Sequence, residues 1–167
     1  PEREQAYLRI LQSEGARLSR LIENVLELSK LEKKRREPNL LAGRFDDVLA
    51  EVETLMRATL KQEGFVFKVD NRLTRPFRYD REIMVQVLIN LIENSVKFGK
   101  GSGVKAITVR LRERGGRAVV EVADTGPGIP RQDLNKVFND FYRADNAVAR
   151  AAGGTGIGLA LVKRFVA

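Results

Sequence analysis

Residues 86–98 run Gln86-Val87-Leu88-Ile89-Asn90-Leu91-Ile92-Glu93-Asn94-Ser95-Val96-Lys97-Phe98, with the apolar periodicity of a helix that packs on a core. Together with the residues before it, this pattern predicts a helix over roughly 81–97, capped at its start by Asp80. Its buried face is predicted to consist of Ile83, Met84, Val87, Leu88, Leu91, Ile92 and Val96.

Three polar residues, Asn90, Asn94 and Lys97, share another face of this helix, because residues three and four apart are neighbours on a helix. Asparagine is a modest helix former, so two of them on one face of an apolar helix need a reason. Amide oxygens can coordinate Mg²⁺, which also takes nucleotide oxygens as ligands, and a lysine can neutralise phosphate charge. A polar edge that faces solvent explains the same residues, and the helix alone leaves both interpretations open.

A β-hairpin is predicted after this helix. Apolar and polar side chains alternate over residues 107–112, as in a half-buried strand. Gly115-Gly116 supplies a turn that needs positive φ, and residues 118–123 form the return strand. The return strand ends at Asp124, which places this carboxylate at the edge of a sheet.

Other elements are predicted on either side. A helix over roughly 46–62 begins with Asp46 as N-cap and stops at Gly64. The remaining expected elements are a strand over 65–69, a turn beginning at Asp70-Asn71, a short helix near 131–137 in which Pro130 opens the first turn, and a last helix over 157–166. This order of elements implies an α+β fold in which helices pack on one face of a mixed β-sheet.

The N-terminal part has a different pattern. Leu11, Leu18 and Val25 recur every seven residues within a predicted helix over 3–34, which favours a helical bundle over packing on the chain's own domain. We expect three segments: a bundle helix over 1–36, a linker over 37–44 and a globular domain over 45–167.

Composition excludes several classes of protein. The 167 residues include no cysteine and no histidine, which excludes disulfides and argues against a structural zinc site. No apolar run approaches the length of about 20 residues that a membrane span needs. The net charge of +8 attracts polyanions, but the basic cluster between Lys30 and Arg36 has no aromatic residue to stack on a base. We therefore expect a solvated basic surface and no nucleic-acid partner.

Two glycine-rich stretches carry further chemistry. The first, Asp124-Thr125-Gly126-Pro127-Gly128-Ile129, combines a carboxylate at a strand end with glycines that allow close backbone approach to a ligand. The second, Gly153-Gly154-Thr155-Gly156-Ile157-Gly158-Leu159, precedes a helix whose N-terminal amides favour anions. It is not a Walker P-loop, because no Lys-Ser or Lys-Thr follows its last glycine. By itself, the second stretch is equally well explained as a hinge and as a phosphate loop.

In this order, the motifs resemble the nucleotide site of bacterial two-component sensor histidine kinases. Residues 86–98 look like the N box, 124–129 like the first glycine box, 137–143 like the F box and 154–159 like the second glycine box. Leu28-Ser29-Lys30-Leu31-Glu32 resembles part of the second helix of the family's dimerisation bundle.

The resemblance implies ATP and Mg²⁺ as ligands and assigns a role to each matching residue. Asp124 would bind the adenine amino group, Asn94 would ligate Mg²⁺, and Asn90, Lys97 and Arg143 would be the catalytic residues close to the phosphates. The other expected nucleotide contacts are Phe98, Gly126, Gly128, Ile129, Tyr142, Gly154, Thr155, Gly156, Ile157, Gly158 and Leu159. Phe141 and Tyr142 would anchor a lid over roughly 139–155.

The chain departs from the family pattern in three ways. The phosphoacceptor histidine is absent, so the chain cannot phosphorylate itself. Asn139-Asp140 stands where the family usually has Glu and a basic or small residue, and the closing strands expected after Ala167 are missing. The resemblance further implies a homodimer through the helical bundle, a response regulator receiver domain as partner, and a cytoplasmic location for this segment within a protein anchored in the inner membrane.

Two rival interpretations remain. An ATP-hydrolysing relative, as in type II topoisomerases, mismatch-repair proteins or the related chaperone, would carry a water-activating Glu where this chain has Asn90, and Glu93 lies about 100° further round the helix. A degenerate nucleotide-binding scaffold would not need to keep Asn94, Lys97 and Asp124 together.

Overall fold

The computed structural model describes residues 38–144 and 154–166, together with Tyr7, Gly15, Leu18, Ser19 and Ile22. These five N-terminal residues are helical. The prediction of a bundle helix over 3–34 otherwise falls outside the described residues, and so does much of the expected lid.

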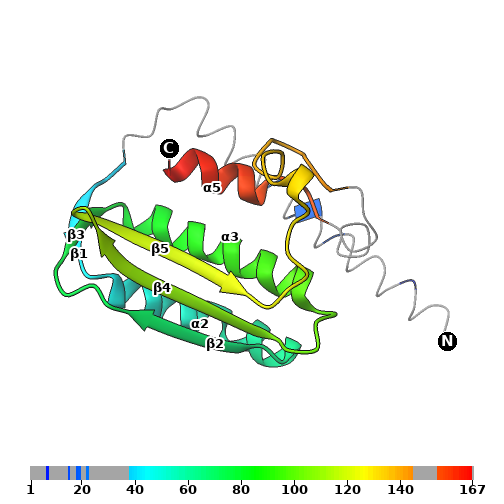
Figure 1. Cartoon of the computed structure of the whole chain (residues 1–167), viewed down its shortest axis with the longest axis horizontal. Helices are drawn as coiled ribbons and strands as arrows, with labels where there is room; N and C mark the ends of the chain where they lie inside the picture. Colours follow the sequence, from blue (N-terminus) through cyan, green and yellow to red (C-terminus); the bar gives the residue numbers. More distant parts are fainter. Residues whose placement is uncertain are drawn as a thin grey trace.

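The described strands form one mixed sheet and one small antiparallel sheet (Figure 1). The mixed sheet has the order β2 (Val66–Asn71), β4 (Ala106–Arg114), β5 (Arg117–Asp124), with β2 parallel and β5 antiparallel to β4. The small sheet pairs β1 (Leu41–Gly43) with β3 (Phe77–Tyr79). The predicted hairpin is confirmed, and its turn residues Gly115 and Gly116 have φ values of 56° and 76°.

Two long helices, α2 (Phe45–Glu63) and α3 (Arg81–Gly99), cover the same face of the mixed sheet (Figure 1). The last helix, α5 (Gly158–Val166), lies against α3, and a short 3₁₀ helix, η1 (Arg131–Asp133), follows β5. The α+β architecture expected from the order of elements is therefore confirmed.

The core lies between the two long helices and β4. Ile107, Val109 and Leu111 are fully buried, as the alternation in this strand predicts. Between them, Arg110 lies on the open face of the sheet and pairs with Glu121, its cross-strand neighbour, at 2.5 Å. Facing side chains of the core include Val48, Val52, Leu88 and Ile92.

The start of α2 differs from the prediction. Arg44, and not Asp46, is the N-cap, and it makes no side-chain capping bond. The helix begins earlier because Phe45 is buried and stacks on Tyr79 with a 4.3 Å separation of ring centroids. Asp46 instead accepts a hydrogen bond from Asn71 at 2.8 Å. The predicted stop at Gly64 is confirmed, because this residue caps α2 with a φ of 74°.

Three smaller expectations also need correction. Asp70 and Asn71 continue β2 instead of starting a turn, since Asp70 is held by an ion pair to Arg112 of the neighbouring strand. The helix near 131–137 is only the 3₁₀ turn η1, with Pro130 as its N-cap. Residues 41–43, expected within a linker, form β1 and pair with β3.

Asp80 is buried and holds two backbone amides. Its Oδ1 accepts a hydrogen bond from Ile83 N at 3.1 Å, as expected for the cap of α3, and its Oδ2 accepts one from Asn39 N at 2.9 Å. The same carboxylate therefore ties the segment before β1 to the start of α3.

We predict that Asp80→Ala lowers the free energy of unfolding by about 1–2 kcal/mol, because α3 loses its N-cap and the amide of Asn39 loses its acceptor. Asp80→Asn keeps one acceptor oxygen and is expected to lose about half as much. Urea unfolding followed by circular dichroism measures both values. Equal stability of Asp80→Ala and the wild-type chain would contradict this assignment.

Candidate functional site

The asparagine face of α3 meets the start of α5. A Cβ built on Gly158 would lie 3.2 Å from Asn90 Oδ1 and 3.7 Å from Asn94 Nδ2, so only a small residue fits there comfortably. Asn90 Nδ2 donates to Gln86 O at 3.0 Å, which turns its amide oxygen toward Gly158. Two residues of the predicted N box therefore lie beside a glycine of the second glycine box.

Lys97 joins the same site one turn further along α3. Its Nζ lies so close to Gly154 that a Cβ on this glycine would overlap it, and the ammonium is 4.8 Å from the Phe98 ring centroid. Gly154 has a φ of 110°, a conformation that glycine adopts readily. The second glycine stretch thus runs along the polar face of α3, from Lys97 to Asn90.

Asp124 is held at the end of β5 by two hydrogen bonds. Its Oδ2 accepts one from Ser95 Oγ at 2.9 Å, and its Oδ1 accepts one from Gly126 N at 2.8 Å. Ser95 is a buried residue of α3, so this bond fixes the carboxylate relative to the asparagine face. Sequence reasoning missed Ser95, although a lone hydroxyl among the apolar residues of α3 was a usable signal.

The loop after Asp124 is shaped by Thr125 and by a close approach at Gly126. Thr125 Oγ1 donates to Val104 O at 2.6 Å and accepts from Ala106 N at 3.0 Å, which fastens the loop to the start of β4. A Cβ on Gly126 would lie 2.8 Å from Asp124 Oδ1. The carboxylate itself stays exposed at the edge of the sheet, where a ligand can reach it.

The F-box segment packs on the second glycine stretch. A Cβ on Gly156 would lie 2.7 Å from both Phe141 C and Tyr142 O, and Phe141 has a φ of 60°, which is unusual for a residue with a side chain. Tyr142 donates its hydroxyl to the buried Asp133 at 2.7 Å, and this bond raises the pKa of the Tyr142 hydroxyl. Sequence reasoning did not single out Asp133, because its partner is nine residues away and no helical or strand period joins them.

The other residues predicted to contact the nucleotide differ in how far they are buried. Ile157 is fully buried against Leu161, and its amide donates to Thr155 Oγ1 at 3.3 Å. Phe98 and Leu159 are half-buried, whereas Gly128, Ile129 and Arg143 are exposed. Contact of these residues with a nucleotide stays a prediction. The central part of the expected lid, residues 145–153, lies outside the described residues.

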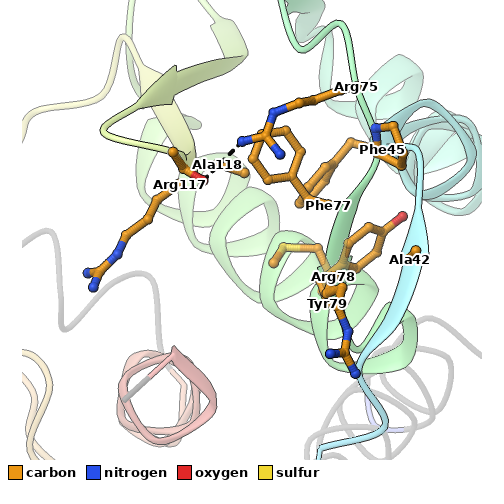
Figure 2. A pocket seen from close by; sticks show the side chains of 11 residues that line it. Ala42, Phe45, Arg75, Phe77, Arg78, Tyr79, Arg117 and Ala118 are labelled. Atoms are coloured by element: carbon orange, nitrogen blue, oxygen red, sulfur yellow. Dashed lines mark hydrogen bonds between the residues drawn. The ribbon is translucent and has the colours of Figure 1, made fainter.

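A separate cavity of about 510 Å³ lies at the other end of α3 and β5 (Figure 2). It is lined by the aromatic side chains of Phe45, Phe77 and Tyr79 and by residues next to the hairpin turn. Arg75 lies over the Phe77 ring and forms an ion pair with Glu113 at 2.6 Å. None of the residues predicted for the nucleotide site lines this cavity.

Comparison with known proteins identifies the family of this chain. Residues 79–167, which include all four motifs, match the family described as "Histidine kinase-, DNA gyrase B-, and HSP90-like ATPase". The chain belongs to this ATPase family. The match supports ATP binding by this domain.

Proteins similar to this chain include sensor histidine kinases. The chain is 33% identical to the circadian input-output histidine kinase CikA of Synechococcus elongatus, over 99% of this chain and 22% of that protein. A crystal structure of full-length ShkA in complex with AMPPNP has a TM-score of 0.79 and 26% identity, covering 96% of this chain and 33% of that one. The crystal structure of histidine kinase ThkA in complex with the response regulator protein TrrA has a TM-score of 0.70 and 26% identity, covering 85% of this chain and 41% of that one.

The chain thus spans about a fifth of the CikA relative's length. Among the residues that the structure describes, no helix has the length and apolar character needed to cross a bilayer. Within this part of the chain there is also no group of three or more acidic side chains arranged as a metal site.

Proposed function

We propose that this chain is the ATP-binding catalytic domain of a two-component sensor histidine kinase. It would transfer the γ-phosphoryl group of ATP to a histidine outside this chain, for onward transfer to a response regulator. The observation that carries the proposal is the contact of the second glycine stretch with the polar face of α3, at Lys97 and Asn90.

The site residues fall into two groups, those that would bind the adenine base of ATP and those that would bind its phosphates. Asp124, already oriented by Ser95 and Gly126, would accept a hydrogen bond from the adenine amino group. Lys97 would neutralise phosphate charge beside the glycine backbone, whose amides near the start of α5 favour anions. Arg143 would meet the transferred phosphoryl group.

The residues present fit a Mg²⁺ ion bound mainly through the nucleotide. Asn94 supplies an amide of the kind that Mg²⁺ accepts, and this ion usually takes few protein ligands together with phosphate oxygens and waters. The ion would neutralise charge that develops on the phosphates. The absence of an acidic cluster in the described part of the chain fits this arrangement.

In the proposed reaction, no residue of this chain forms a covalent bond to the phosphoryl group. An imidazole nitrogen of the acceptor would form a bond to the γ-phosphorus while the bond from that phosphorus to the β–γ bridging oxygen breaks and ADP leaves. Phosphoryl transfer of this kind depends on positioning and on charge neutralisation. Because the chain has no histidine, the acceptor must come from another segment or protein.

The partners follow from the same proposal. The structure of ThkA with TrrA supports a response regulator as the second acceptor, and the heptad pattern of the N-terminal segment supports a homodimer through a helical bundle. We place this segment in the cytoplasm, where ATP and such a partner are available. The inner-membrane anchor implied by the resemblance concerns segments outside this chain and stays an expectation.

Hydrolysis of ATP by this chain is disfavoured. Where an ATP-hydrolysing relative would need a carboxylate base, α3 has Asn90, whose amide is engaged with Gln86 O. Glu93 is exposed on another face of the helix.

The function is tested by calorimetric titration with a non-hydrolysable ATP analogue, with and without Mg²⁺. We expect micromolar, Mg²⁺-assisted binding, followed by transfer of the label from [γ-³²P]ATP to a separately supplied histidine-bearing bundle. Label that appears as inorganic phosphate at the same rate without the bundle would contradict the kinase assignment. Absence of analogue binding would contradict the nucleotide site itself.

We predict that Asn94→Ala removes the dependence of binding on Mg²⁺ while leaving the helical circular dichroism unchanged, because the side chain is half-buried and would act as the metal ligand. Asn135→Ala, the same change at an exposed position, serves as control and should retain the Mg²⁺ effect. A lower helix content in Asn94→Ala would favour a structural role instead.

A further inference from the structure

Asp133 is a buried carboxylate whose Oδ1 accepts a hydrogen bond from the hydroxyl of Tyr142 at 2.7 Å. The other buried polar residues of the described part of the chain have roles given above: Asp80 caps α3, and Ser95 orients Asp124. Burying a carboxylate is costly unless it is hydrogen-bonded, so the bond to Tyr142 is the main compensation for burial of Asp133.

The backbone of Asp133 is held independently of its side chain. Its amide donates to Pro130 O at 2.8 Å, and its carbonyl accepts from Lys136 N at 2.8 Å and Val137 N at 2.9 Å. The 3₁₀ turn is thus closed by main-chain bonds. A change of the Asp133 side chain should therefore act on Tyr142 and leave the turn in place.

Tyr142 belongs to a segment in an unfavourable conformation. Its neighbour Phe141 is the only non-glycine residue with positive φ in the described part of the chain, and the residue is 63% exposed. Packing of the Phe141 ring therefore does not account for this conformation. Two bonds of the next residue hold it: Tyr142 N donates to Asn139 O at 3.2 Å, which closes a turn across Phe141, and the Tyr142 hydroxyl donates to the buried carboxylate.

The strained segment lies directly on the second glycine stretch. Phe141 C and Tyr142 O approach Gly156 as closely as a glycine permits. Gly156 in turn lies between Gly154, which contacts Lys97, and Gly158, which contacts Asn90 and Asn94. A continuous series of contacts thus leads from Asp133 through Tyr142 to the polar face of α3.

We propose that Asp133 is a positioning residue, which holds the second glycine stretch against Asn90, Asn94 and Lys97 by anchoring Tyr142. This inference rests on the proposed function for its effect on ATP. Because Asp133 is buried, we expect it to act on ATP only through the tyrosine. The exposed ion pair between Asp140 and Arg164, at 2.6 Å, joins the same segment to α5 and contributes less, because solvent screens it.

A double-mutant cycle tests the proposal by calorimetry with the non-hydrolysable ATP analogue. We expect Asp133→Ala and Tyr142→Phe each to weaken binding about tenfold, and the double variant to bind no more weakly than either single one. Asp133→Asn keeps an acceptor for the tyrosine hydroxyl and should bind within about threefold of the wild-type chain. Asp140→Ala, the matched control in the same segment, should bind within about twofold.

A second readout does not depend on ATP. In ¹H–¹⁵N spectra of the free chain, Asp133→Ala and Tyr142→Phe should both shift the amide resonance of Gly156, while the resonances of Gly126 and Gly128 stay in place. The two measurements separate the two hypotheses. Calorimetry that shows no analogue binding by the wild-type chain refutes the proposed function. A Gly156 resonance that stays in place in both variants refutes the positioning role. Additive losses in the cycle, or an Asp133→Asn variant as weak as Asp133→Ala, would also overturn the positioning role.

Discussion

Gly156→Ala is expected to weaken binding of the ATP analogue at least about a hundredfold, the largest effect of any single substitution considered for this chain. A Cβ at this position would lie 2.7 Å from main-chain atoms of Phe141 and Tyr142, which cannot move aside as the end of a flexible side chain can. Its φ of 74° adds a backbone cost of about 1–2 kcal/mol for a residue with a side chain. The segment and the glycine stretch must separate, and the contacts at Lys97 and Asn90 are lost with them.

Gly64→Ala provides a matched control for this experiment. Gly64 has the same φ of 74°, but a Cβ there would meet nothing within 4 Å. It ends α2 away from the candidate site, so we expect a loss of stability of about 1 kcal/mol and unchanged affinity for the analogue. Calorimetry and urea unfolding measured on both variants separate the backbone cost from the clash. Similar affinities of the two variants would show that the contact at Gly156 does not shape the site.

Asp124→Asn is expected to weaken the same binding by about 1–3 kcal/mol, which corresponds to a loss of about 5- to 150-fold. The carboxylate accepts from Ser95 Oγ and Gly126 N and would also accept from the adenine amino group. An amide has one acceptor oxygen and one donor nitrogen, so at least one of these partners would face a donor instead. Calorimetric titration measures the change, and a GTP analogue shows whether discrimination between bases falls as well.

Two further variants make this result specific. Ser95→Ala removes only the hydroxyl that orients the carboxylate, and we expect a smaller loss than for Asp124→Asn. Glu121→Gln is the matched change of a carboxylate to an amide on the same strand, on the open face of the sheet, and should leave affinity within about twofold. Unchanged affinity in Asp124→Asn would refute the assignment of the adenine contact.

Local chemistry made much of the fold predictable. The hairpin around Gly115-Gly116 was predicted because two adjacent glycines between alternating segments permit the positive φ values that the turn has. The start of α3 was predicted from Asp80, which is an N-cap by its chemistry. The start of α2 was predicted wrongly, because the burial of Phe45 against Tyr79, 34 residues later, outweighs the capping preference of Asp46.

The amino-acid sequence alone was sufficient to identify the family and its expected ligand, because four motifs in order specify residue types whose chemistry is local. Asn90, Asn94 and Lys97 share a helix face by spacing alone, and Asp124 ends a strand by alternation alone. Only the tertiary structure shows that Ser95 donates to Asp124, that Gly158 lies beside Asn90 and Asn94, and that Tyr142 donates to Asp133. These contacts join residues that no helical or strand period relates, so they exist only once α3, β5 and α5 have packed together.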